Sequence, residues 1–214
     1  MSMDLLRRAA HAAHDAIRAN EDRIEGLDRA IGDGDHYHNV IRGAEVAAKL
    51  ADELGDAAPD QAPDQALKQI GMKLLSTIGG ASGPLMSSFF LAAAKTPGAG
   101  AVWDRATVTA MVRDGVAAIQ ARGKAKQGDK TMLDTLIPVA EALEAGAGDD
   151  PAALAAKVQA AAEAGMQSTK DILATKGRAA FLGERAIGHI DPGAMSCCVI
   201  VTAICQTVAS GETL

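Results

Sequence analysis

Helical spacing of apolar residues, with no stretch of strand-like alternation, limits the fold of this chain more than any other feature. The first apolar stripe consists of Leu5, Leu6, Ala9, Ala13 and Ile17. Spacings of three and four residues place such side chains on one face of a helix. Aromatic residues make up only 2% of the chain, whereas large β-sandwiches depend on aromatic and β-branched residues. The sequence therefore predicts an all-α protein.

Capping residues and glycine clusters divide the chain into nine expected helices. Ser2, Asn20 and Thr107 are candidate N-caps, and Asp150 precedes a proline at the first helical position. The expected helices cover residues 3–19, 21–30, 39–54, 64–75, 86–95, 107–123, 132–145, 151–174 and 194–208. The long loop at 176–193 is rich in glycine and charge, and loops of this length in compact domains are often functional.

The chain length and its globular composition predict a single domain over residues 1–214. Short connections favour antiparallel helices that run up and down. In that arrangement alternate junctions lie at the same end of the bundle. Four glycine-rich motifs at separate junctions would then meet in one site.

Charge and hydropathy exclude several classes of function. The formal net charge is −6 and no basic stripe is visible, so nucleic-acid binding is not expected. The longest apolar stretch, 197–204, is well short of the ~20 residues of a membrane span, and no apolar run follows Arg7 and Arg8 as in a secretory signal. The three cysteines lie within 197–205 without other zinc ligands, which is typical of reduced core residues in a cytoplasmic protein.

Three carboxylates lie close together near the end of the second expected helix. Asp28 precedes a glycine-rich turn that carries Asp33 and Asp35. Hard cations such as Mg²⁺ prefer oxygen ligands, and carboxylates supply these together with negative charge. The spacing by itself leaves two interpretations equally open, a metal cluster or a polar turn with local hydrogen bonds. An EF-hand is excluded because Ala44 occupies the position of the closing glutamate.

Three further motifs are compatible with phosphate binding. Residues 79–84 form a small-residue turn before a helix, where free N–H groups and the helix dipole attract phosphate. In residues 128–134, Lys130 could neutralise phosphate charge and Thr131 is a candidate helix cap. In residues 176–193, Arg178 is suited to phosphate recognition. Close helix packing, simple capping and a solvated loop are the respective alternative interpretations.

Together the four motifs resemble the nucleotide-binding L subunit of dihydroxyacetone kinase, in the family's order and over nearly the whole chain. The resemblance implies an antiparallel eight-helix barrel with the nucleotide at one end. It implies ADP or ATP as the bound nucleotide and two Mg²⁺ ions held by Asp28, Asp33 and Asp35. The residues that it places around the nucleotide are His36, Tyr37, His38, Asn39, Ala81, Ser82, Gly123, Thr131, Met132, Arg178, Asp191, Pro192 and Gly193.

The resemblance also implies partners. The expected activity is phosphoryl transfer to a small ketose held by a separate K-type sugar-binding subunit, with ATP or a phosphotransferase-system protein as the phosphoryl donor. Tyr37 and then His38 follow His36, where the family usually has glycine, so either the pocket wall or the position of the turn is expected to differ there. Two other functions stay open: a regulatory module that contacts a transcription regulator, and a metal-dependent phosphohydrolase.

Overall fold

The computed structural model describes residues 3–57, 63–100 and 103–210, and within these ranges every regular element is helical. The expectation of an all-α protein is therefore confirmed. The elements are α1 (Met3–Ala19), α2 (Glu21–Ile31), α3 (His36–Ala57), α4 (Pro63–Thr77), α5 (Ser82–Ala93), α6 (Arg105–Gly123), α7 (Leu133–Ala145), α8 (Pro151–Ser168), the 3₁₀ helix η1 (Arg178–Ala186) and α9 (Pro192–Ser210).

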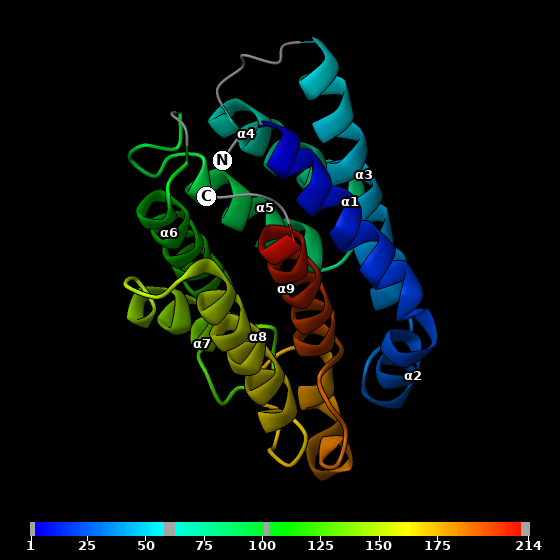
Figure 1. Cartoon of the computed structure of the whole chain (residues 1–214). Coiled ribbons are helices and arrows are strands. Elements are labelled where there is room, and N and C mark those ends of the chain that lie inside the picture. The colour runs from blue at the N-terminus through cyan, green and yellow to red at the C-terminus, as the bar shows by residue number, and fades with distance from the viewer. Residues whose placement is uncertain (1–2, 58–62, 101–102, 211–214) are drawn as a thin grey trace.

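Eight of these helices close into a ring (Figure 1). Each of α3 through α8 contacts the next helix in the chain, α8 contacts α9, and α9 contacts α1, which in turn packs against α3. The remaining long helix, α2, lies at one end of the ring, next to η1. This is the expected antiparallel eight-helix barrel, with α2 as the additional ninth helix of the sequence pattern.

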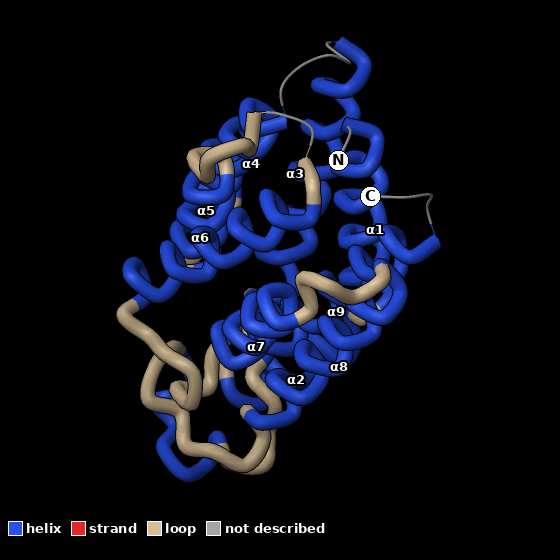
Figure 2. Tube along the Cα trace, turned by 60° about the vertical axis from the view of Figure 1, so that its left-hand side comes forward, coloured by secondary structure: helices blue, strands red, loops and turns tan. Residues whose placement is uncertain are grey.

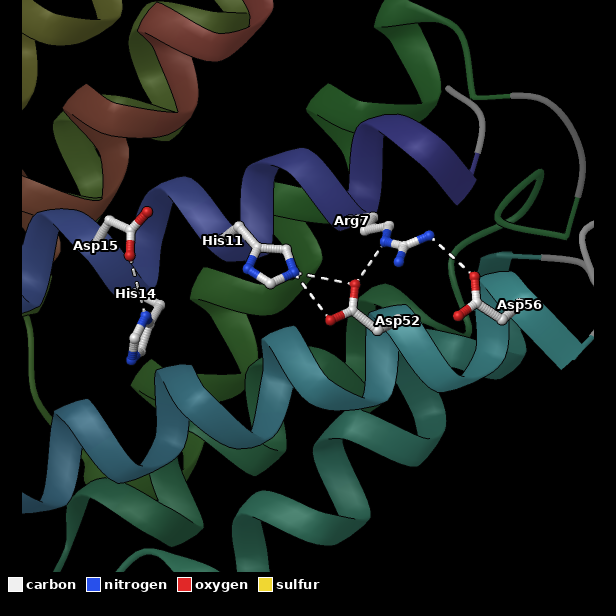
Figure 3. A network of polar contacts seen from close by, with 6 residues as sticks. All are labelled: Arg7, His11, His14, Asp15, Asp52 and Asp56. Atoms are coloured by element: carbon white, nitrogen blue, oxygen red, sulfur yellow. Dashed lines mark hydrogen bonds and ion pairs between the residues drawn. The ribbon is translucent and has the colours of Figure 1, made fainter.

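Apolar packing and a surface network join the neighbouring helices. The largest buried cluster contains Ile17, Ile24, Val158 and Met195, which come from α1, α2, α8 and α9. On the surface, Asp52 of α3 accepts hydrogen bonds from Arg7 and His11 of α1 (Figure 3). Exposed pairs of this kind contribute little to stability, so the barrel is held mainly by burial of its apolar stripes.

Helix α9 is apolar enough to raise the question of a membrane span. Pro192–Ala209 passes a test of length and composition, with a mean hydropathy of 1.6. Within the barrel, however, α9 packs against α1, α7 and α8, and such central helices have the same composition as membrane spans. Its contacts therefore account for its apolar character.

Several helix ends differ from the sequence expectation. Helix α8 ends at Ser168 rather than near residue 174, because the following carbonyl groups turn toward the Lys130 ammonium group. Part of the expected loop at 176–193 forms η1. Helix α3 begins at His36 instead of Asn39, and α5 begins at Ser82 instead of residue 86.

Two of the candidate N-caps are corrected by the structure. The cap of α6 is Asp104, whose carboxylate accepts a hydrogen bond from the Thr107 backbone N–H at 2.8 Å. Asn20 precedes α2 but makes no side-chain cap, since its amide donates to the Ala16 carbonyl. Asp150 caps α8 as expected, and Ser2 lies outside the described residues.

The contact between α7 and α8 leads to a stability prediction. A Cβ atom at Gly165 would lie 2.2 Å from the Asp134 carbonyl oxygen, so the two backbones would have to separate. We expect Gly165→Ala to lower the free energy of unfolding by roughly 1–3 kcal/mol, as measured by urea denaturation. Gly26→Ala is the matched control, because that helical glycine has open space around its Cβ position. The control should raise stability by up to about 1 kcal/mol, and equal effects of both substitutions would contradict the packing argument.

Candidate functional site

Four separate junctions of the chain meet at one end of the barrel. The α2–α3, α4–α5 and α6–α7 connections and the segment between α8 and α9 line a common cavity of about 440 Å³. Figure 2 shows long loops gathered at one end of the molecule. The up-and-down course of the helices produces this meeting point, since α3, α5, α7 and α9 all begin there.

The cavity gathers nearly all of the residues singled out from the sequence. Those that line it are Asp28, Asp33, Asp35, His36, Asn39, Ala81, Ser82, Gly123, Thr131, Met132, Arg178, Asp191, Pro192 and Gly193. Only Tyr37 and His38, of the residues named from the resemblance, do not line it. Residues up to 165 positions apart in the sequence, such as Asp28 and Gly193, thus share one site.

The three aspartates converge in the lining of the cavity. One carboxylate oxygen from each of Asp28, Asp33 and Asp35 lies within 4.8 Å of the others. Asp28 is almost fully buried in the last turn of α2, whereas the other two are exposed on the turn. Gly34 takes a φ of 79°, a left-handed conformation that glycine adopts without steric cost. At Gly32 a Cβ atom would lie 1.8 Å from an Asp28 carboxylate oxygen, so the turn closes over Asp28 only with glycine there.

Hydrogen bonds orient the cluster and the residues that follow it. The His36 backbone N–H donates to the second Asp28 oxygen at 2.9 Å, and the His36 ring nitrogen lies 3.1 Å from the Ser196 hydroxyl of α9. Burial lowers the pKa of His36, against the opposing effect of the nearby aspartates. The Asn39 side chain accepts from the Gly79 N–H at 3.2 Å. These contacts tie the aspartate turn to two other junctions of the site.

The aspartate oxygens suit a hard divalent cation. Magnesium binds oxygen at about 2.0–2.1 Å, so oxygens on opposite sides of one ion are about 4 Å apart. The oxygens of the cluster lie within 4.8 Å of one another. This spacing is compatible with three ligands to one ion or with ligands divided between two ions. Arg178 of η1 pairs with Asp33 at 2.9 Å. This pair places a positively charged hydrogen-bond donor directly beside the same carboxylates.

One wall of the cavity is apolar, and the sequence analysis did not name its residues. Leu85, Ile119, Ala125 and Leu133 contribute this wall from α5, α6, the α6–α7 loop and α7. Their helical spacing is the same as that of core residues, so sequence pattern alone assigns them to the core. Arg122, at the end of α6, lines the cavity as well and was not singled out either.

Tyr37 and His38 point away from the cavity. The Tyr37 ring is buried in the main apolar cluster, 7% exposed, and its hydroxyl donates to Glu21 at 3.0 Å. His38 is exposed and lies 3.9 Å from Glu25. Because α3 starts at His36, residues 36 and 39 share the face toward the cavity and the two between them do not. The expectation that these two side chains reshape the pocket wall is therefore wrong.

Lys130 is buried and holds the backbone of the neighbouring segment. It is 1% exposed, has a left-handed φ of 61°, and its ammonium donates to the carbonyl oxygens of Thr169 at 2.6 Å and His189 at 2.7 Å. Weaker contacts at 3.2 and 3.3 Å reach the carbonyls of Lys170 and Ile172. Burial lowers the pKa of Lys130, although nearby aspartates oppose the shift. Its ammonium is thus occupied by backbone and is not free to neutralise phosphate.

Two helix starts at the cavity are closed by their own side chains. Thr131 accepts a hydrogen bond from the Leu133 N–H and its own N–H donates to Asp134 at 2.8 Å, a reciprocal capping box. Met132 is the residue directly before α7 and makes no side-chain cap, so Thr131 holds the first turn of the helix from one position further out. Asp191 accepts from the Ala194 N–H at 2.8 Å at the start of α9, and burial raises the pKa of this carboxyl to about 7. By contrast, Ala81 at the start of α5 makes no side-chain cap.

The fold and the site together define a class of protein: an all-α barrel of eight helices that carries a carboxylate cluster and a cavity at one end. The family model described as the DAK2 domain matches residues 30–206, and the chain belongs to this family. The resemblance drawn from the four motifs is thus confirmed.

Relatives of known function match almost the whole chain. It is 44% identical over 186 residues to the Escherichia coli protein named PEP-dependent dihydroxyacetone kinase, ADP-binding subunit DhaL, covering 85% of this chain and 86% of the relative. A Listeria innocua protein with the same subunit name is 39% identical and covers 91% of both chains.

A solved structure shares the fold. The chain superimposes with a TM-score of 0.74 and 28% identity on the dihydroxyacetone kinase from C. freundii, crystallised with AMP-PNP and Mg²⁺. The match covers 95% of this chain but only 34% of that kinase, so the chain corresponds to about one third of the larger protein.

Proposed function

We propose that this chain is the nucleotide-binding subunit of a dihydroxyacetone-type kinase. In this role it holds ADP or ATP with Mg²⁺ and transfers a phosphoryl group to a small ketose bound by a K-type subunit. The observation that carries the proposal is the convergence of the aspartate cluster and three phosphate-compatible junctions on one cavity. The names of the E. coli and Listeria relatives support the subunit assignment.

Each part of the cavity suits one part of a nucleotide. The apolar wall around Leu85 and Ile119 would hold the base. The uncapped N-terminus of α5 at Ala81 and Ser82 presents backbone N–H groups and a positive dipole end to the phosphates. Arg178, which already lies against Asp33, is placed to bind phosphate oxygens near the cluster.

We propose that two magnesium ions bind at the aspartate cluster. Their ligands would be Asp28, Asp33 and Asp35. When bound, magnesium neutralises phosphate charge and aligns the attacking and leaving oxygens. The chain carries a net charge of −6, so the ions supply positive charge that its side chains do not. The protein itself positions the carboxylates through the closed Gly32 turn and the His36 N–H bond.

The finer assignments belong to the same proposal. Since the E. coli relative is named PEP-dependent, we propose that ADP stays bound and is rephosphorylated in place by a phosphotransferase-system protein. The setting would be the cytoplasm, where such a system operates on small sugars. Survival of bound ADP through extensive dialysis, detected by mass spectrometry, supports this version, whereas complete loss of ADP favours exchange of ATP.

The direct test is reconstitution with a sugar-binding subunit. The chain is mixed with the K-type subunit of a dihydroxyacetone kinase and a panel of ketoses. The phosphoryl donor is either ATP or phosphoenolpyruvate with its phosphotransferase proteins. We expect ketose phosphate to form. Neither subunit alone should produce it, because this chain supplies the nucleotide and the partner the acceptor. Absence of transfer with every donor, while ADP and Mg²⁺ still bind, would leave a regulatory module as the better account. Free hydrolysis of ATP by the isolated chain would instead indicate a phosphohydrolase.

A further inference from the structure

The segment of residues 169–191, between α8 and α9, borders the mouth of the nucleotide cavity. Arg178 and Ala179 of η1 line the cavity itself. Figure 1 shows this segment, in yellow to orange, at the end of the barrel where α2 also lies. A protein that brings an acceptor to a nucleotide in this cavity must approach over or beside this segment.

Backbone hydrogen bonds and small buried side chains hold residues 169–191 in place. The Lys130 ammonium binds carbonyls at both of its ends, and the Gly188 N–H donates to the Lys170 carbonyl at 2.8 Å. Thr175 adds a hydroxyl donor to Asp129. A small buried cluster of Ile31, Ala174, Ala179 and Ala186 supports η1 from below. These contacts order the segment through backbone bonds and small side chains.

Phe181 is left out of this packing. It is 84% exposed, more than any other large apolar side chain among the described residues. In a 3₁₀ helix residues three apart are eclipsed, so Phe181 stands on the same face of η1 as Arg178. Arg178 in turn reaches Asp33 of the aspartate cluster. Phe181 is therefore presented at the rim of the phosphate end of the cavity.

Exposed cations lie on the same segment as Phe181. Those on the segment are Lys170, Lys176, Arg178 and Arg185. The exposed acids are Asp171 and Glu184 on the segment, and Asp33, which pairs with Arg178, and Asp35 on the aspartate turn. The facing α6–α7 junction adds exposed Arg122, Lys124 and Lys126. The seven exposed cations of these two segments outnumber the four exposed acids of the segment and the aspartate turn, so this end is more basic than the chain as a whole, whose net charge is −6. An exposed aromatic anchor within a charged rim is the arrangement found at protein interfaces.

We propose that Phe181 is the apolar anchor of a docking surface for the acceptor-carrying subunit, whose facing rim is acidic. The proposal rests on the proposed function, which places the acceptor on a separate subunit. Docking of the partner would bury Phe181 and close the cavity mouth against water. The exposed cations would guide the encounter, so association should weaken as ionic strength rises.

The test compares Phe181→Ala with Met72→Ala, a control at an exposed apolar residue of α4 that is 52% exposed. The K-type subunit is the probe, and its affinity, its apparent KM in phosphoryl transfer and the kcat at saturation are measured. We expect Phe181→Ala to weaken binding and raise the KM by about 10- to 30-fold, with kcat and ADP affinity unchanged. The control should match the wild type, and urea denaturation should show both variants folded.

Other outcomes overturn the proposal and remain distinct from failure of the proposed function. Unchanged partner affinity in Phe181→Ala excludes the anchor. A loss of ADP affinity in that variant would show that Phe181 contacts the bound nucleotide instead of the partner. Self-association of the wild type that Phe181→Ala abolishes assigns the surface to a second copy of the chain. Partner binding without any transfer refutes the kinase function while the affinity comparison still decides the role of Phe181.

Discussion

Replacing Asp33 with alanine is expected to abolish magnesium-dependent binding of ADP while the barrel stays folded. Asp33 is exposed on the turn after α2, so its removal disturbs no packing. It supplies one of the three carboxylates whose oxygens lie within 4.8 Å, and its loss leaves two ligands for the cation. Loss of even an outer-shell partner of a metal ligand costs 10- to 100-fold, so we expect the affinity to fall by at least about 100-fold.

Calorimetric titration of ADP with and without magnesium, and again with a chelator, measures this effect. Asp22→Ala is the matched control, because it removes an exposed aspartate from the first turn of α2, the helix that precedes the aspartate turn. Thermal unfolding followed by circular dichroism checks that both variants retain the fold. Magnesium-dependent affinity that survives in Asp33→Ala would show the turn to be a polar turn, the interpretation that spacing alone left open.

The second large effect is expected from Lys130→Met. This substitution leaves the carbonyl groups of Thr169 and His189 without their ammonium donor in a buried position. Since a buried acceptor without a partner costs about 1–3 kcal/mol, we expect a loss of about 3 kcal/mol in the free energy of unfolding. Arginine should not restore the loss, because its planar guanidinium does not fit the site of a compact ammonium.

Lys124→Met is the control for this prediction. Lys124 also has a left-handed backbone, with a φ of 49°, and lies in the same loop, but it is exposed. Urea denaturation measures stability, and hydrogen exchange should show that residues 169–191 lose protection first in Lys130→Met. ADP affinity should fall as well, because Arg178 and Asp191 belong to this segment. If ADP affinity falls while stability and protection are unchanged, Lys130 binds phosphate directly and its structural role is refuted.

Tyr37 and His38 show that the direction of a side chain depends on where its helix begins. Both follow His36 in the motif, and the family resemblance places them at the nucleotide pocket. The start of α3 at His36 turns successive side chains by about 100°, and Tyr37 enters the core instead. A difference of three residues in the expected helix start was enough to reverse the direction of these side chains.

Lys130 and the end of α8 illustrate a second limit. Residues 169–174 contain neither glycine nor proline, so the local sequence does not signal an end to the helix at Ser168. The chain turns there because an ammonium group 39 residues earlier in the sequence binds the Thr169 carbonyl. Local patterns do not report such contacts, and a lysine in a glycine-containing loop is interpreted as a surface or phosphate-binding residue.

The sequence by itself determined the all-α class, the sites where glycines interrupt the helices, and the short spacing of the three aspartates along the chain. These features depend on the period of apolar residues and on local backbone freedom, both of which act over a few neighbouring positions. Only the tertiary structure decided that α9 closes onto α1, which side chains enter the cavity, and that Lys130 is buried while Phe181 is exposed. The reason is that burial and direction depend on atoms from distant parts of the chain, which meet only when the ring of helices is closed.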